Sequence, residues 1–177
     1  MAGNREDFLL MVVGAITLDA TTKMPIVVLK DPDNKLNLQI WIGPLEATAV
    51  ATELEGIKTQ RPMTHDLLRN LLTEFGATVE AVEVTELRDN TYFARIELKG
   101  RDGAPIILDS RPSDAIAVAL RTKSPIYVAK AVLEASSDLH ESAAELGGGD
   151  QNLAGVSRDK WSEILERMSP EDFKYKM

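Results

Sequence analysis

The first half of the chain alternates apolar runs with short polar turns and then changes to a helical spacing of apolar positions. The apolar runs are rich in Val, Ile and Leu and predict three strands, at Phe8–Leu18, Met24–Leu29 and Leu36–Ile42. A helix is predicted from Pro44, because proline suits the first helical position. Four leucines between His65 and Phe75 share one helical face, so a second helix is predicted there, ending before Gly76.

The second half repeats this order of elements. Strands are predicted at Thr78–Leu87, Tyr92–Leu98 and Pro105–Leu108. A helix from Pro112 to Arg121, a short extended segment at Pro125–Val128 and a last helix from Lys130 to about Ala135 follow. The pattern predicts an α+β fold, in which a unit of three strands and two helices is duplicated around a single core. The sheet is expected to be mixed or antiparallel, with the helices packed on it.

An internal repeat supports this duplication. The nine residues from Gly43 to Ala51 align without a gap on those from Arg111 to Ala119, an offset of 68 residues, and five of the nine are identical. Such a repeat separates residues that the fold requires, which both copies keep, from residues that only one copy has acquired.

The chain divides into three parts by composition. Residues 1–136 are predicted to form one domain, with repeat halves at about 8–75 and 78–135. Residues 137–156 include the run Gly147–Asn152 (GGGDQN) and offer little apolar surface to bury, so they predict a flexible linker. Residues 157–177 predict an amphipathic helical tail, because Trp161, Ile164, Leu165 and Met168 recur at helical spacing. This tail either docks on the domain or binds a partner.

Charge and cysteine content narrow the function classes. The net charge of −8 argues against a protein that coats nucleic acid, although local contact with phosphates is compatible with it. The absence of cysteine excludes thiolate chemistry and suits a reducing compartment. The apolar run at Phe8–Leu18 is too short to cross a bilayer, so we expect a cytoplasmic protein without membrane contact.

Comparing the two copies separates structural from chemical candidates. Glu46 and Asp114 occupy equivalent positions in the first turn of a helix, where capping alone explains an acid. Asp109 and Arg111 differ, because their counterparts are Trp41 and Gly43. Both lie where a strand ends and a helix begins, a place that suits an anion or a metal, and an Asp109–Arg111 ion pair is the structural alternative.

A second cluster, from Arg61 to Asp66, leads into the leucine-rich helix. Thr64 and Asp66 are explained by capping and by the helix dipole. Histidine is a common general base, and His65 lies near an acid and an arginine in the sequence, so it is a candidate base, with an ordinary surface residue as the alternative. Phosphate loops, His-x-x-x-His pairs, nucleophile elbows and glycine-rich dinucleotide motifs are absent from the sequence.

Four motifs together resemble the bifunctional nuclease family, a domain of bacteria and plants. They are Trp41–Ala47 (WIGPLEA), Arg61–Leu68 (RPMTHDLL), Asp109–Ala117 (DSRPSDAIA) and Pro125–Val128 (PIYV), and the resemblance covers about residues 8–135. It implies a compact α+β domain that cleaves both DNA and RNA.

The first functional hypothesis is therefore a metal-assisted phosphodiesterase that takes nucleic acid as its substrate. Asp66 and Asp109, with Glu46 or Asp114, would hold Mg²⁺ or Mn²⁺. Arg61 and Arg111 would bind the phosphate, and His65 would orient or deprotonate the attacking water. Asp66, Asp109 and Arg111 are thus candidate catalytic residues beside His65.

The second hypothesis is a non-catalytic protein-interaction or regulatory module, in which these same residues hold the helix starts. A homodimer is expected from the duplicated domain and its amphipathic tail, and light scattering at high protein concentration would check it.

Overall fold

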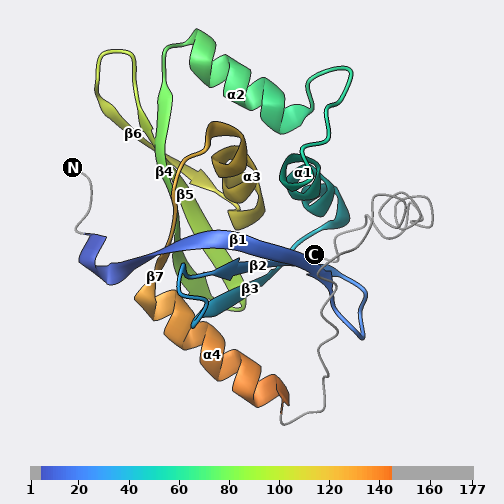
Figure 1. Cartoon of the computed structure of the whole chain (residues 1–177). Helices are drawn as coiled ribbons and strands as arrows, with labels where there is room; N and C mark the ends of the chain where they lie inside the picture. The colour runs from blue at the N-terminus through green and yellow to red at the C-terminus, as the bar shows by residue number, and fades with distance from the viewer. Residues whose placement is uncertain (1–4, 145–177) are drawn as a thin grey trace.

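The computed structural model of the protein describes residues 5–144, and residues 1–4 and 145–177 lie outside this description. The described elements, in chain order, are η1 (Arg5–Asp7), β1 (Phe8–Leu18), β2 (Pro25–Lys30), β3 (Asn37–Trp41), α1 (Pro44–Leu54), α2 (Thr64–Glu74), β4 (Thr78–Arg88), β5 (Thr91–Lys99), β6 (Pro105–Ser110), α3 (Pro112–Thr122), β7 (Ile126–Ala129) and α4 (Lys130–Ala144) (Figure 1). The predicted α+β class is confirmed.

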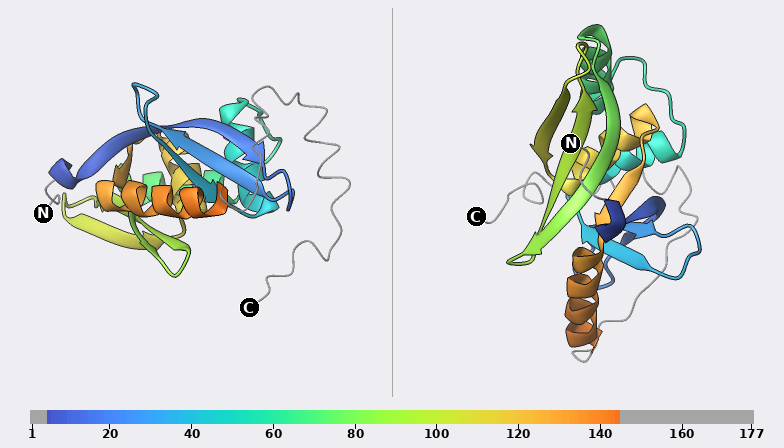
Figure 2. Two further views of the ribbon diagram at one scale, coloured as in Figure 1. Left: turned by 90° about the horizontal axis from the view of Figure 1, so that it is seen from below. Right: turned by 90° about the vertical axis from the view of Figure 1, so that its left-hand side faces the viewer.

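The strands form one mixed sheet in the order β3-β2-β1-β7-β4-β5-β6. It consists of two antiparallel meanders, β1-β2-β3 and β4-β5-β6, joined by β7. Strand β7 pairs antiparallel with the start of β1 and parallel with β4. The two meanders run in clearly different directions, so the sheet is strongly bent (Figures 1 and 2).

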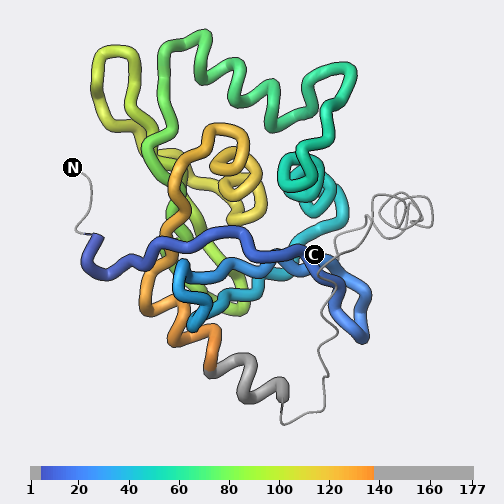
Figure 3. The backbone as a smooth tube through the Cα atoms, viewed as in Figure 1, coloured from blue at the N-terminus to red at the C-terminus, as the bar shows by residue number. Residues whose placement is uncertain are grey.

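Helices α1 and α3 pack side by side over the sheet, and α2 packs on α3 (Figure 3). The residues that α1 and α3 bury are mainly alanine and valine, which allow the two helices to approach closely. The core includes residues of both meanders, among them Leu29, Leu38, Val82, Val84 and Ile96. Helix α4 contacts β3, β4 and β7. Side-chain contacts also join the start of α3 to the starts of α1 and α2.

The two halves share their first four elements, three strands and an 11-residue helix, and diverge afterwards. The short extended segment predicted at Pro125–Val128 is the central strand β7, shifted by one residue.

One further expectation differs from the structure. Helix α4 continues to Ala144, so it includes the first residues of the linker predicted at 137–156. The rest of that linker and the tail at 157–177 lie outside the described residues. Helix α2 buries none of its residues fully, and its leucine face is largely exposed.

Candidate functional site

Arg111 joins the starts of α1 and α3. Both helices begin with a proline and have no side-chain cap at the preceding residue, which is Gly43 in α1 and Arg111 in α3. The Arg111 guanidinium donates from Nη1 to Glu46 Oε1 at 2.6 Å and from Nε to Asp114 Oδ2 at 2.8 Å. The two repeat-equivalent acids thus share one arginine.

His65 extends this arrangement to α2. Its Nε2 lies 3.1 Å from Asp114 Oδ1, so Asp114 bridges the imidazole and the Arg111 guanidinium. We call Glu46, Arg111, Asp114 and His65 the helix-start network. The His65 side chain is 13% exposed and that of Arg111 is 56% exposed, so the network reaches solvent through the arginine.

The helix-start network stabilises the ionised forms of Asp114 and Arg111. Burial raises the pKa of Asp114, but the hydrogen bonds from Arg111 and His65 and their positive charges outweigh it, and the pKa lies below its ordinary value. The hydrogen bond to Asp114 is the main cause that raises the pKa of Arg111, with Glu46 adding to it. Asp114 is therefore a carboxylate at neutral pH and orients the ring of His65.

Asp66 belongs to a different cluster, although it follows His65 directly. Its Oδ2 accepts from the backbone N–H of Met63 at 3.0 Å, which caps α2. Its Oδ1 accepts from Nε of Arg121 at 2.8 Å, and the Arg121 side chain is only 1% exposed. Burial raises the pKa of Asp66, and the bonds from Met63 and Arg121 lower it further than burial raises it. The helix begins after Met63, so Thr64 is not the cap that the sequence indicated.

Arg61 lies in the loop before α2 and lines an open pocket of about 340 Å³. Asp66, Arg69 and Arg121 line the same pocket, as does Lys58. Arg61 is therefore close to Asp66, as expected, but it does not join Arg111.

Asp109 is separate from both clusters. It is exposed near the end of β6, opposite Arg95 of β5, which in turn lies opposite Glu83 of β4. The neighbouring residues Ala94 and Ile96 point into the helix-covered core. Because side chains alternate along a strand, Asp109 faces the other side of the sheet. The Asp109–Arg111 ion pair considered above is replaced by the pairs of Arg111 with Glu46 and Asp114.

The four acids expected to hold a metal do not form one donor set. Arg111 occupies the space between Glu46 and Asp114, Asp66 binds Arg121, and Asp109 lies on the opposite face. Among the residues that the structure describes, no three His, Asp or Glu side chains are grouped to hold a metal ion. The residues as they lie do not fit a protein-bound Mg²⁺ or Mn²⁺.

Sequence reasoning missed Arg121, although the repeat contained the signal. Arg121 is the equivalent of Glu53 at the offset of 68 residues, and the two side chains lie 4.0 Å apart. Arg111 was singled out because the other repeat has Gly43 at the equivalent position. The same comparison identifies Arg121, because the other repeat has Glu53 there.

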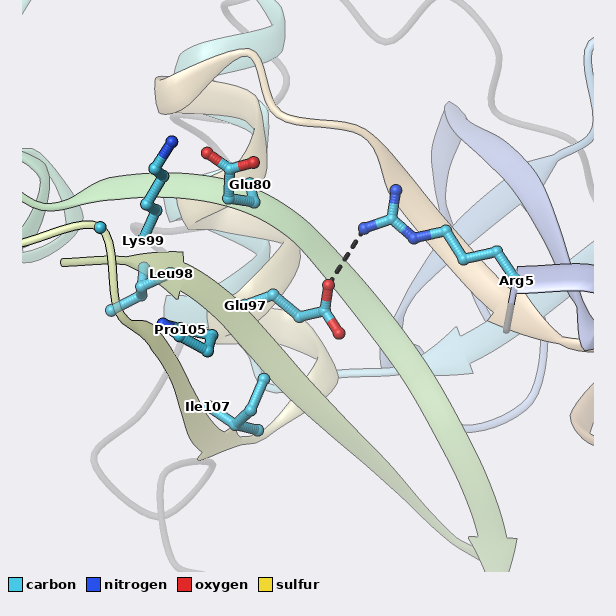
Figure 4. A pocket seen from close by; sticks show the side chains of 8 residues that line it. Arg5, Glu80, Glu97, Leu98, Lys99, Pro105 and Ile107 are labelled. Atoms are coloured by element: carbon cyan, nitrogen blue, oxygen red, sulfur yellow. Dashed lines mark hydrogen bonds and ion pairs between the residues drawn. The ribbon is translucent and has the colours of Figure 1, made fainter. Parts of the chain in front are cut away.

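A second hollow, of about 170 Å³, lies on the β5-β6 side of the sheet (Figure 4). Arg5 donates to Glu97 Oε2 at 3.0 Å there, and the buried Glu83 binds Arg95 at 2.6 Å. The Arg5 guanidinium also lies over the ring of Tyr127. Together with the approach of Arg5 Nε to Glu83 Oε1 at 3.8 Å, these contacts fasten the beginning of the described chain to β4, β5 and β7.

Comparison with known proteins places the helix-start network in a family domain. The sequence model of the bifunctional nuclease domain matches residues 27–140, a range that contains all seven candidate site residues. An uncharacterized protein of Mycobacterium tuberculosis is 34% identical over 166 residues, which cover 92% of this chain and 96% of that protein. Bifunctional nuclease 1 of Oryza sativa is 30% identical over 112 residues, or 62% of this chain, and Bifunctional nuclease 1 of Arabidopsis thaliana is 31% identical over 109 residues, or 60% of it. The match spans 34% of each plant protein. No helix in residues 5–144 is long and apolar enough to cross a membrane.

Proposed function

Because the chain belongs to the bifunctional nuclease domain family, we propose that it hydrolyses phosphodiester bonds of DNA, RNA or both. The observation that carries this proposal is the helix-start network, in which a histidine, a carboxylate and an exposed arginine meet inside the family domain. These groups can serve phosphodiester hydrolysis as a base, a group that orients the base, and a cation for the phosphate.

His65 would act as the general base. When its Nε2–H donates to Asp114, Nδ1 carries the free lone pair and can accept a proton. As the water oxygen bonds to phosphorus, its proton passes to Nδ1 and the bond from phosphorus to the leaving oxygen breaks. The leaving oxygen then takes a proton from solvent. Asp114 would stabilise the imidazolium that forms, since its lowered pKa keeps it ionised.

Arg111 would bind the phosphate that is attacked. Its guanidinium is the most exposed part of the network, and arginine binds phosphate oxygens through forked hydrogen bonds. Glu46 and Asp114 would fix the orientation of this guanidinium before substrate arrives. Asp66 would act as a positioning residue, because it caps the helix that carries His65.

The divalent metal expected from the sequence stays a proposal, and no step of the scheme above uses it. Mg²⁺ usually keeps several waters and binds through one or two carboxylates together with substrate phosphates rather than in a dedicated protein cage. Chelation followed by readdition of Mn²⁺ or Mg²⁺ tests this requirement directly.

The decisive experiment is cleavage of single-stranded DNA and RNA by purified variants. His65→Ala and Asp114→Asn should each lower the rate at least tenfold, the usual minimum for losing a general base or its orienting partner. Lys35→Gln is the control, because Lys35 lies in an exposed turn between β2 and β3 and, within residues 5–144, its side chain pairs only with Asp33. The parent activity should vanish in chelator if the metal proposal holds.

A non-catalytic interaction module is the second candidate function. The exposed apolar side chains of Leu67 in α2 and of Phe75 just after it favour this module, because such patches mark protein contacts. Cleavage that persists unchanged in both variants and in chelator would indicate a contaminating nuclease and leave this module as the better account. Two finer expectations, a homodimer and a cytoplasmic location, likewise stay proposals.

A further inference from the structure

The open pocket beside α2 has a net positive lining in an acidic protein. Its charged lining consists of four cations, Lys58, Arg61, Arg69 and Arg121, and two acids, Glu53 and Asp66. The lining therefore carries two more positive than negative charges, whereas the whole chain carries a net charge of −8. We call this group the basic pocket.

Two cations of the basic pocket are held by hydrogen bonds within the protein, and the other two are available to bind a ligand. Arg121 is held by Asp66 and by the backbone carbonyl of Ala117, to which its Nη1 donates at 3.1 Å. Arg69 donates to its neighbour Asn70. Lys58 and Arg61 are exposed, and their side chains form no hydrogen bond or ion pair within the described part of the chain. Lysine and arginine presented in this way suit phosphate oxygens.

The basic pocket lies next to the helix-start network. His65 contacts Asp114 while the following residue, Asp66, contacts Arg121. Asp114 and Arg121 lie on the same helix seven residues apart, which corresponds to about 10 Å along its axis. A nucleic acid strand carries one phosphate for about every 3.4 Å of B-form rise, so a few nucleotides reach from one place to the other.

We propose that the basic pocket binds an uncleaved phosphate of a single-stranded nucleic acid whose scissile phosphodiester, a few nucleotides along the strand, lies at the helix-start network. This inference rests on the proposed function and adds a substrate requirement to it. The protein recognises a strand with flanking phosphates and binds an isolated phosphodiester weakly. Lys58 and Arg61 supply the additional contacts that a strand with flanking phosphates makes and an isolated phosphodiester does not.

The test measures binding, so it does not depend on cleavage. The full-length protein is titrated into a fluorescein-labelled phosphorothioate DNA of about 12 nucleotides, within the usual range of single-strand sites, and anisotropy is followed at several salt concentrations. The double variant Lys58→Gln/Arg61→Gln should bind at least tenfold more weakly. Its slope of log affinity against log salt should become less negative by about 0.7 for each phosphate that the variant no longer neutralises.

Two controls make the result specific. Lys23→Gln/Lys35→Gln removes the same charge from exposed turns outside the pocket and should keep the parent affinity and slope. A thymidine dinucleotide, with a single phosphodiester, should bind the pocket variant less than threefold more weakly than it binds the parent.

Three outcomes of the anisotropy titrations would overturn the inference, and a competition experiment gives a fourth. They are parent-like binding by the pocket variant, an equal weakening in the control variant, or an equal weakening for the dinucleotide. Polyglutamate that displaces the DNA at the same charge concentration would also overturn it, in favour of an acidic protein partner. Failure of the nuclease proposal gives a different result: no cleavage that depends on His65, with the binding difference intact.

Discussion

His65 and Asp66 are neighbours in the chain, yet their side chains diverge to opposite ends of α3. His65 contacts Asp114 in the first turn of that helix, and Asp66 contacts Arg121 in the last. Helix capping alone would make Asp66 a minor contributor to stability. The buried partner changes this, because removing Asp66 leaves the guanidinium of Arg121 without its closest anion.

Asp66→Ala should therefore lower the free energy of unfolding by about 3–5 kcal/mol, the range for breaking a buried ion pair, rather than the ~1 kcal/mol of a missing cap. Urea denaturation measures this difference. The double variant Asp66→Ala/Arg121→Met should recover part of the stability, because it removes the uncompensated charge. A decrease of ~1 kcal/mol in Asp66→Ala, unchanged in the double variant, would show that the cap is the only role of Asp66.

The pairing of α1 with α3 is the contact on which the candidate site depends. Equivalent positions of the two helices face one another, with Glu46 and Asp114 meeting at Arg111 and Glu53 lying near Arg121. The side chains between them are small or β-branched and fully buried, as in Val50 and Val118. This close packing brings charges from two helices within hydrogen-bonding distance.

Substitution by alanine should lower stability much more in the buried helix α3 than in the largely exposed helix α2. Ile116 of α3 is 0% exposed, so Ile116→Ala should cost about 2–5 kcal/mol in thermal or urea unfolding. Leu71 of α2 is 45% exposed, and Leu71→Ala should change stability by no more than about 0.5 kcal/mol. A large decrease in stability at Leu71 would mean that a second copy or another segment covers α2 in solution.

Local sequence patterns predicted most helices and strands of this fold. The features that they did not predict depend on contacts between residues far apart in the chain. The hairpins and α1 follow from turn residues, apolar runs and Pro44, all of which act over a few residues. Strand β7 is only four residues long and becomes central by pairing with β1, more than a hundred residues earlier in the chain. The leucines of α2 predicted the helix correctly but could not show whether its apolar face is buried, because apolar spacing does not reveal whether a partner covers the face.

The candidate site was only partly predicted from the sequence, because its contacts also join residues that are far apart in the chain. Comparing the repeats singled out Arg111 from one sequence, whereas its two carboxylate partners depend on how α1 lies against α3. Asp109 looked equivalent to Arg111 in sequence, but strand alternation turns it to the other face of the sheet. Spacing along the chain thus identified residues, and the tertiary packing decided which of them meet.

The acid stability of the whole molecule should reflect these carboxylates. Burial opposes ionisation of Asp66 and Asp114, but their hydrogen bonds to arginine and other donors set both pKa values below the ordinary value of about 3.9. The pKa values of Asp19 and Asp31 are lowered too, chiefly by backbone N–H groups in their turns. A pKa that is lower in the folded state contributes stability that is complete above the unfolded value and is lost as the pH falls through the folded value.

Melting temperature measured from pH 7 downwards should therefore stay nearly level until about pH 4 and then fall steeply, because protonation breaks these ion pairs. Asp114→Asn should melt lower than the parent at pH 7, since it already lacks the carboxylate that binds Arg111 and His65. Its further decrease between about pH 4 and about pH 2 should be smaller than that of the parent. Leu71→Ala, which changes no charge, should follow the parent profile. Parallel acid profiles for the parent and Asp114→Asn would contradict the lowered pKa of Asp114 and, with it, the ionised partner that the proposed chemistry gives to His65.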